Sequence, residues 1–391
     1  MKTYIVTFEP FPNGMAASNR ILHYGKGLVY AGGECQVVVG QRTEFIGKNR
    51  NIESKGEYQS VPFIYPSGHI YRSKSFIKRR IDDIWDTILL LHYIFLNLKK
   101  NDTILLFTTK ICVSITLQII CSIKNVKIIR ELCELPFATQ NDNYLNNIKR
   151  YFFEKIVLPK FDGVIAISQA LKEYALQFIP AAKIIKIPIL IDANEYDNVV
   201  PYKHERPYIF HGGTMYERKD AIVSTIKGYV EAMKSLSEPV DFILAGPESP
   251  HKDELISILS ENSLLSRVHF IGQLKHDDVL AYQKGAILSI LNKNDNAQNR
   301  NGFSTKLGDI LLAETPVITT TVGEANNFLE DGISAFITEP HNPSLIAQQI
   351  VRALSDEKLR VSVGLGGKQV AIDSFDYKKQ GVILSAFFKN L

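Results

Sequence analysis

The sequence predicts an α/β protein with two doubly wound domains. Short apolar segments alternate with longer segments of helical periodicity along almost the whole chain. That alternation is typical of parallel sheets covered by helices on both faces. A polar stretch with two prolines, residues 191–207, interrupts it about halfway. We therefore expect an N-terminal domain at 1–196, a C-terminal domain at 197–375, and a last helix at 376–391 that packs back on the first domain.

The expected strands are short apolar runs rich in β-branched residues. In the first domain they are residues 3–8, 35–40, 103–107, 127–132, 163–168 and 183–189. In the second they are residues 208–213, 241–246, 268–272, 286–291, 316–320 and 334–338. Because ligands of open parallel sheets bind at the carboxyl ends of the strands, polar residues that follow a strand are the first candidates for a site.

Composition excludes several classes of protein. The chain is 45% hydrophobic and 22% charged with a net charge of +4, which is typical of a globular protein and far from the strongly basic balance of nucleic-acid binders. Four cysteines in 391 residues make no disulfide framework, so we expect buried thiols in a reducing compartment. No Cys or His spacing predicts a metal site, so we expect no metal ligands.

The sequence also bears on a signal peptide and on a membrane-spanning segment. The N-terminus enters a strand directly and shows no signal peptide. The most apolar segment, residues 84–98, contains Asp86 and His92 and is shorter than the ~20 residues of a membrane span. We expect a cytoplasmic protein.

The first candidate site is NGFSTKLGD, residues 301–309. Ser304 or Thr305 can begin a helix, and free amides at such a helix start bind anions. Lys306 and Asp309 are three residues apart, hence on one helix face. A cation beside an anion site, with a carboxylate one turn further, suits the phosphate and the ribose of a nucleotide. A solvated Lys–Asp pair on a surface helix is the alternative.

The second candidate site is GGTMYERKD, residues 212–220, which follows the expected strand at 208–213. A glycine turn followed by cations can neutralise phosphates with backbone amides and ammonium groups together. Lys219 is the cation that we assign to this role. A basic helix start at the surface is the alternative.

With these motifs the chain resembles retaining glycosyltransferase family 4, of the kind that builds bacterial polysaccharides such as capsules. The ordered matches are GGTMYERKD, FILAGPES, VHFIGQL and NGFSTKLGDILLAETPVITT. The resemblance implies the GT-B fold, in which two Rossmann-like domains face a central cleft and close over a nucleotide-sugar donor. It implies donor-binding roles for Gly14, Gly213, Lys219, Leu274, Gly302, Phe303, Ser304, Thr305, Lys306 and Asp309. Catalytic roles are implied for Glu134, Asn301 and Lys219.

Two positions depart from the family pattern. Asn301 stands where the family has the first of two glutamates, and Thr214 stands where it has a basic residue after the glycine turn. Asp309 keeps the second carboxylate, and we expect Lys306 to replace the lost charge. Transfer should proceed with retention and without a metal or other cofactor, because cations and amides stabilise the leaving diphosphate. We interpret residues 141–143 as an Asn-rich turn rather than a metal site.

In the N-terminal half, Gly14 resembles the loop over the donor diphosphate. Glu131 and Glu134 in RELCELP are candidates for contacting the donor sugar or acceptor, and Glu134 is closer to the loop. The run VGLGGKQV, residues 363–370, lacks the Ser or Thr of a P-loop and has helical flanks. We therefore expect it to lie in a helix.

The acceptor is the least specified part of the function. We expect a glycan or a lipid-linked sugar, and no nucleic acid. The basic segment 71–80 precedes the apolar helix at 84–98, and together they could rest on an anionic membrane. An ordinary helix that packs on the sheet is the alternative. A nucleotide-sugar epimerase or a catalytically weak nucleotide-sugar-binding protein are the alternatives to glycosyl transfer.

Overall fold

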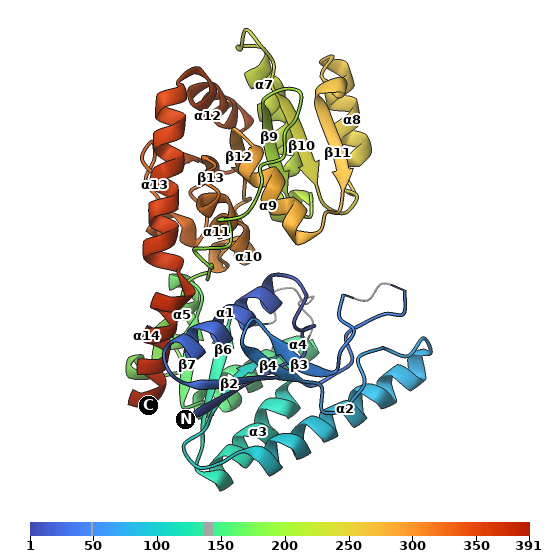
Figure 1. The fold of residues 1–391 in the computed structure, drawn as a ribbon, viewed down its shortest axis with the longest axis vertical. Helices are drawn as coiled ribbons and strands as arrows, with labels where there is room; N and C mark the ends of the chain where they lie inside the picture. The colour runs from blue at the N-terminus through green and yellow to red at the C-terminus, as the bar shows by residue number, and fades with distance from the viewer. Residues whose placement is uncertain (48–49, 137–143) are drawn as a thin grey trace. The chain divides into compact units, whose positions relative to one another are not determined.

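The computed structural model describes residues 1–47, 50–136 and 144–391. The chain forms two compact units (Figure 1): Met1–Leu190 together with Tyr377–Leu391, and Ile191–Asp376. The sequence placed the first boundary after residue 196. The structure places it after Leu190 because Ile191 donates its backbone N–H to the carbonyl of Phe375 at 2.9 Å, within the second unit.

The first unit has a sheet in the order β3-β4-β2-β1-β5-β6-β7-β8. Its central strands β1, β5, β6 and β7 are almost wholly buried, so their sequences read as continuous apolar runs rather than as alternating ones. Strands β1 and β5 pair in parallel. The sheet extends from β1 through β2 and β4 to β3 on one side, and from β5 through β6 and β7 to β8 on the other. The bounds are β1 Lys2–Thr7, β2 Glu34–Val39, β3 Lys55–Tyr58, β4 Val61–Ile64, β5 Thr103–Phe107, β6 Lys127–Leu132, β7 Gly163–Ala166 and β8 Ile184–Lys186.

The hairpin of β3 and β4 corrects the expectation of a purely parallel sheet. The two strands pair antiparallel and form the edge of the first sheet. Gln59 and Ser60 connect them, both with positive φ, as a two-residue primed turn requires. That turn normally carries Asn-Gly or a similar pair, and Gln-Ser gives no such signal in the sequence.

Among the described residues, the α-helices of the first unit are α1 Ala16–Tyr30, α2 Phe76–Asn97, α3 Ile111–Lys124, α4 Tyr144–Phe152, α5 Gln169–Leu176 and α14 Tyr377–Asn390. The chain's last helix, α14, packs on α1 where two glycines meet. A Cβ added to Gly27 would lie 2.9 Å from the Cα of Gly381. Leu384 and Phe388 of α14 complete the core of this unit.

The second unit has a sheet in the order β11-β10-β9-β12-β13-β14, with every pair parallel. This is the doubly wound order. From the neighbouring strands β9 and β12, the sheet extends through β10 to β11 on one side and through β13 to β14 on the other. The bounds are β9 Tyr208–Gly212, β10 Asp241–Ala245, β11 Val268–Gly272, β12 Leu288–Leu291, β13 Val317–Thr320 and β14 Phe336–Thr338.

The helices of the second unit are α6 Glu217–Asp220, α7 Ile222–Met233, α8 Lys252–Glu261, α9 His276–Gly285, α10 Ala297–Asn301, α11 Thr305–Leu312, α12 Pro343–Ser355 and α13 Glu357–Phe375. One core of buried residues joins α7 and α12 to the sheet, for instance through Ile226 and Ile346. The glycine-rich run 363–370 lies inside α13, so the helical expectation for it is confirmed.

Each segment expected to be a strand contains one, so the two-sheet α/β fold is confirmed. The cysteines are free, but Cys112 is exposed, so the expectation of uniformly buried thiols is wrong for that residue. Among the described residues, no helix is long and apolar enough to cross a membrane.

Candidate functional site

The candidate site of the second unit lies at the carboxyl ends of β9 and β12, the point where the strand order reverses. Gly213 follows β9, and its amide donates to the carbonyl of Ala245 at 2.9 Å. A side chain on Gly213 would collide with the ammonium group of Lys306 and with the imidazole of His211. The glycine is therefore needed where the backbone comes close to the first turn of α11.

A buried carboxylate, Asp220, organises the cations of this site. One oxygen of Asp220 accepts hydrogen bonds from Lys293 and Lys306, each at 2.9 Å. The other oxygen accepts from the backbone N–H and the hydroxyl of Thr214, at 2.9 and 2.7 Å. Two ammonium groups share one carboxylate, so the cluster keeps a net positive charge next to the helix start.

The pKa values of the cluster reflect burial and this charge imbalance. Burial, with the nearby charge of Lys293, lowers the pKa of Lys306 to about 8, against the opposing effect of Asp220. Burial and the Lys306 charge lower the pKa of His211 to about 4. Burial alone would raise the pKa of Asp220, but Lys306 and Lys293 lower it well below its ordinary value. The cluster thus holds Asp220 ionised and His211 neutral at neutral pH.

Asp309 and Lys306 line the same small recess, together with His211 and Gly212. Burial and the carboxylate of Glu195 raise the pKa of Asp309 to about 7, and the opposite charge of His276 reduces that effect. His276 itself bonds to Glu195 at 2.8 Å. The cation and the carboxylate that were expected on one helix face therefore line one recess. The pKa of the carboxylate lies near neutral pH.

The start of α11 supplies backbone donors in the same helical turn as Lys306. Ser304 occupies the N-cap position, but its side chain makes no capping hydrogen bond, and Thr305 is the first helical residue. The side chain of Ser304 therefore accepts no hydrogen bond from the first amides of the helix. With the amides carrying the positive end of the helix dipole, this start favours an anion.

The neighbouring candidates have mainly structural side chains. Phe303 is buried and stacks on Phe328 with ring centroids 5.6 Å apart. Gly302 ends α10, and the side-chain amide of Asn301 donates to the backbone carbonyl of Ala297 at 2.8 Å. Leu274, which follows β11, packs on the aromatic cluster around Phe210. For these residues only the backbone or the exposed edge can meet a ligand.

Lys219 differs from the buried lysines. It lies on the short helix α6, and its side chain is exposed. Its charge nevertheless lowers the pKa of Lys306, so the two ammonium groups are close enough to interact. Lys219 thus differs from Lys306 in being accessible to an incoming anion.

Candidates in the first unit separate into one structural and two accessible residues. Glu131 is buried and bonds to Arg20 at 2.7 Å and to the hydroxyl of Tyr24 at 3.0 Å. It is thereby committed to the core. Glu134, three residues on, is exposed at the end of β6. Gly14 precedes α1, where a side chain would strike the hydroxyl of Ser18.

Sequence reasoning missed several residues of the site. Asp220 and Lys293 are 73 residues apart, and Asp220 and Lys306 are 86 apart, so no local motif joins them. Glu195 and His276 are 81 apart. A signal for Lys293 was present in its position. It follows β12, and polar residues that follow a strand are the first candidates for a site.

One cluster of side chains in the second unit could hold a metal ion. No motif in the sequence predicted this cluster. His204, Asp241 and His269 place one ligand atom each within 4.8 Å of one another. They lie at the amino ends of the strands, away from the cluster just described. Residues 141–143, interpreted from the sequence as a turn, lie outside the described residues.

The second unit matches a known protein family. Residues 194–370 match the family described as "Glycosyl transferases group 1". An uncharacterized glycosyltransferase of Methanocaldococcus jannaschii, MJ1069, is 22% identical over 268 residues. The alignment spans 65% of this chain and 66% of that protein, just under two thirds of its length.

Solved structures show the fold over the whole chain. Sucrose-phosphate synthase from Thermosynechococcus elongatus has a TM-score of 0.74 at 15% identity, covering 100% of this chain and 98% of that one. Anabaena HepE in complex with UDP has a TM-score of 0.70 at 16% identity, covering 100% of both chains. The fold is accordingly that of the GT-B glycosyltransferases.

Proposed function

We propose that this chain transfers a sugar from a nucleoside-diphosphate sugar to a glycan or lipid-linked acceptor. The observation that carries the proposal is the pairing of Lys306 and Asp309 in one recess at the uncapped start of α11. It offers a cation and amides to a diphosphate and a carboxylate to the hydroxyls of a ribose. The UDP bound in HepE supports this class of donor.

Stabilising the leaving diphosphate is the main chemical task of such a site. When the bond between sugar and phosphate breaks, negative charge grows on the diphosphate, and preorganised donors stabilise that charge. Lys219 is exposed and free to approach it, while Lys306 is fixed by Asp220. In this proposal the sugar is transferred with retention, and Asn301 and Glu134 contact the sugar or the acceptor.

Calorimetric titration of UDP and of pyrophosphate separates the roles of the two recess residues. Asp309→Asn should weaken binding of UDP but scarcely affect pyrophosphate, because only UDP carries a ribose. Lys306→Ala should weaken both. Asp253→Asn, which removes an exposed carboxylate from the first turn of α8, is the matched control and should bind like wild type. Equal UDP affinity in Asp309→Asn and wild type would remove the ribose assignment.

Transfer should not need a divalent metal. The cations of the cluster and the amides of α11 already provide the charge that a metal would bring to the diphosphate. Product formation should therefore continue in excess chelator. Activity that disappears in chelator and returns with magnesium or manganese would contradict this part of the proposal, and formation of an epimer from donor alone would favour an epimerase.

For the acceptor, we propose that helix α2 rests on an anionic membrane surface. Only Asp86, Leu90 and Ile94 of this 22-residue helix are buried. Cations flank it, with Lys74 and Lys78 exposed near its start. Its exposed apolar side chains recur every three to four residues on one face: Phe76, Ile77, Ile81, Ile84, Trp85, Ile88, Phe95 and Leu96.

This pattern supports the membrane over the alternative of a helix that mainly packs on the sheet. Trp85 is 55% exposed and Ile77 is 71% exposed, and an apolar face of this kind inserts at the boundary of lipid headgroups and chains. Neighbouring α3 adds Ile119 and Ile123, also exposed. Helices α2 and α3 run side by side in Figure 1.

Co-sedimentation with vesicles tests this surface. The protein should bind vesicles that contain anionic lipid more strongly than neutral ones. Ile81→Ser with Trp85→Ser should abolish the binding, while Ile333→Ser, an equally exposed isoleucine at 55% in the second unit, should leave it intact. Equal partitioning onto neutral and anionic vesicles would contradict the proposal and leave a soluble glycan as the acceptor.

A further inference from the structure

The amino ends of β10 and β11 carry a cluster of metal-ligating side chains that the proposed function does not use. Asp241 is the first residue of β10, His269 is the second residue of β11, and His204 lies in the segment before β9. His269 pairs in register with Ile243. Since Ile243 is two residues after Asp241, both side chains lie on one face of the sheet.

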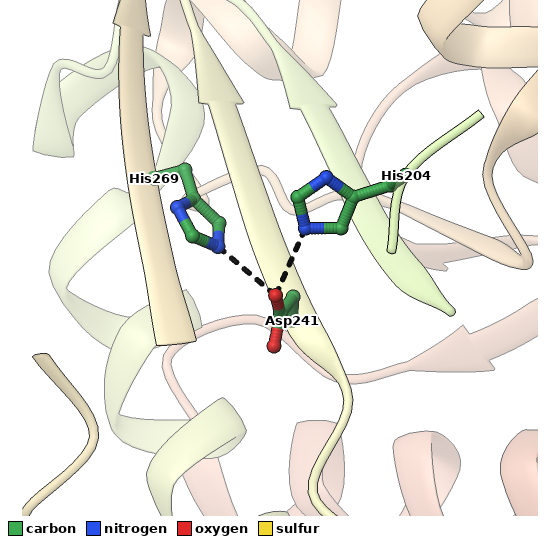
Figure 2. Close-up of side chains that lie close together, drawn as sticks. All are labelled: His204, Asp241 and His269. Carbon is green, nitrogen blue, oxygen red and sulfur yellow. Dashed lines mark hydrogen bonds and ion pairs between the residues drawn. The ribbon is translucent and has the colours of Figure 1, made fainter. Parts of the chain in front are cut away.

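The ligand atoms converge on a single point (Figure 2). The Nε2 atom of His204 lies 2.9 Å from Oδ2 of Asp241, and the Nε2 atom of His269 lies 3.0 Å from the same oxygen. Asp241 is 3% exposed in its side chain, and the two imidazoles are 18% and 35% exposed. The carboxylate is thus buried, and the imidazoles leave an approach from solvent.

The second oxygen of Asp241 has different partners. Arg267 lies 3.3 Å from Oδ1, and Arg206 lies 3.9 Å from it. These guanidinium groups fix the orientation of the carboxylate so that Oδ2 faces the two imidazoles, as outer partners do in metal centres. Their positive charges also oppose a dication, so the site should bind more weakly than a structural zinc centre that has thiolate ligands.

We propose that His204, Asp241 and His269 form a binding site for a divalent transition-metal ion, with Zn²⁺ as the metal that suits two imidazoles and one carboxylate. Bonds of ~2.0–2.2 Å to zinc in a tetrahedron place ligand atoms roughly 3.4 Å apart. The observed separations need to open by only a few tenths of an ångström. The ion takes the place of the Nε2 protons that the imidazoles donate to Oδ2, and water completes the coordination.

The ion would join three segments of the second unit that are distant in sequence. His204 and Asp241 are 37 residues apart, and Asp241 and His269 are 28 apart. The site lies at the opposite end of β10 from Ala245, whose carbonyl accepts from Gly213 of the nucleotide site. Four residues at ~3.3 Å each separate the two ends by about 13 Å. The role is therefore structural, and it is independent of the proposed transfer.

Titration of the full chain with Zn²⁺, after removal of metal by a chelator, tests the site. Wild type should bind one equivalent, and its melting temperature should rise with the Zn²⁺ concentration. His204→Gln and His269→Gln should each lower the affinity by at least about tenfold. His251→Gln is the matched control, because His251 contacts one carboxylate only, that of Glu254 at 3.5 Å, and it should bind like wild type.

The variants keep Asp241 and its arginine partners, so they should fold, which circular dichroism and melting without metal will check. Co²⁺ in place of Zn²⁺ should give visible absorption bands in wild type that both variants lose. Unchanged Zn²⁺ affinity in both variants would overturn the proposal. Failure of wild type to bind Zn²⁺ would do so too, and would leave the cluster as a hydrogen-bond network.

Discussion

The two units contain buried ion clusters of similar composition but opposite consequence. In the first unit, Arg20 and Glu131 form a balanced pair with side chains that are 2% and 0% exposed. In the second, Asp220 is shared by Lys293 and Lys306, whose side chains are 11% and 29% exposed. The balanced pair leaves no charge for a ligand, whereas the cluster with two lysines leaves one positive charge beside a recess.

The comparison teaches that burial of a charged residue does not by itself indicate a binding site. Further acceptors complete the first pair: Arg20 also donates to the carbonyls of Pro188 and Ile187, at 2.5 and 2.8 Å. Such a closed network stabilises one arrangement of the core. The second network is open on one side, and its unbalanced charge is what an anionic substrate can use.

The largest expected effect comes from breaking the balanced pair. Glu131→Gln leaves the guanidinium of Arg20 buried without its counter-charge, which should cost ~3–5 kcal/mol of unfolding free energy. Urea denaturation measures this loss. Glu134→Gln, at an exposed glutamate three residues after Glu131, should leave the unfolding midpoint unchanged. A small loss in Glu131→Gln would mean that the pair is dispensable.

The next effect concerns the exposed cation of the open cluster. Lys219→Ala should leave folding intact and remove a charge-assisted contact to the donor diphosphate, worth ~1.5–3 kcal/mol. That corresponds to a fall of roughly 10- to 150-fold in kcat/KM. Steady-state kinetics of sugar transfer measures it. Unchanged kcat/KM would show that Lys219 is only a surface cation.

A smaller effect on stability sharpens the contrast between the clusters. Lys306→Met removes one of two cations from Asp220 and leaves its bond to Lys293. The unfolding free energy should therefore fall less than it does in Glu131→Gln. Pyrophosphate affinity should fall clearly, because the open charge is lost. If stability falls as far as in Glu131→Gln, the second cluster is a structural pair like the first.

Another effect is a difference in pH dependence. The pKa of Asp309 is raised from 3.8 to about 7, mainly by burial, so the folded state holds a proton that the unfolded state releases. Stability should fall as the pH rises through this interval and level off above pH 7. Asp309→Asn should remove that part of the slope in melting curves. An identical slope in both proteins would contradict the raised pKa.

How much the sequence could predict depended on the distance between partners along the chain. Lys306 and Asp309 were assigned to one face of one helix, and they line one recess. The strands were predicted because their apolar runs are local. The edge hairpin escaped prediction because the Gln-Ser turn between β3 and β4 lacks the usual turn residues.

Local sequence patterns were enough to predict the two α/β units and the helix that begins after Ser304. Helical and strand periodicities are set by neighbouring residues, so these features need no distant partner. Only the tertiary structure decided that Glu131 is buried against Arg20, that Asp220 unites two lysines, and that two histidines meet Asp241. Strand order brings these residues together, and no local spacing encodes that order.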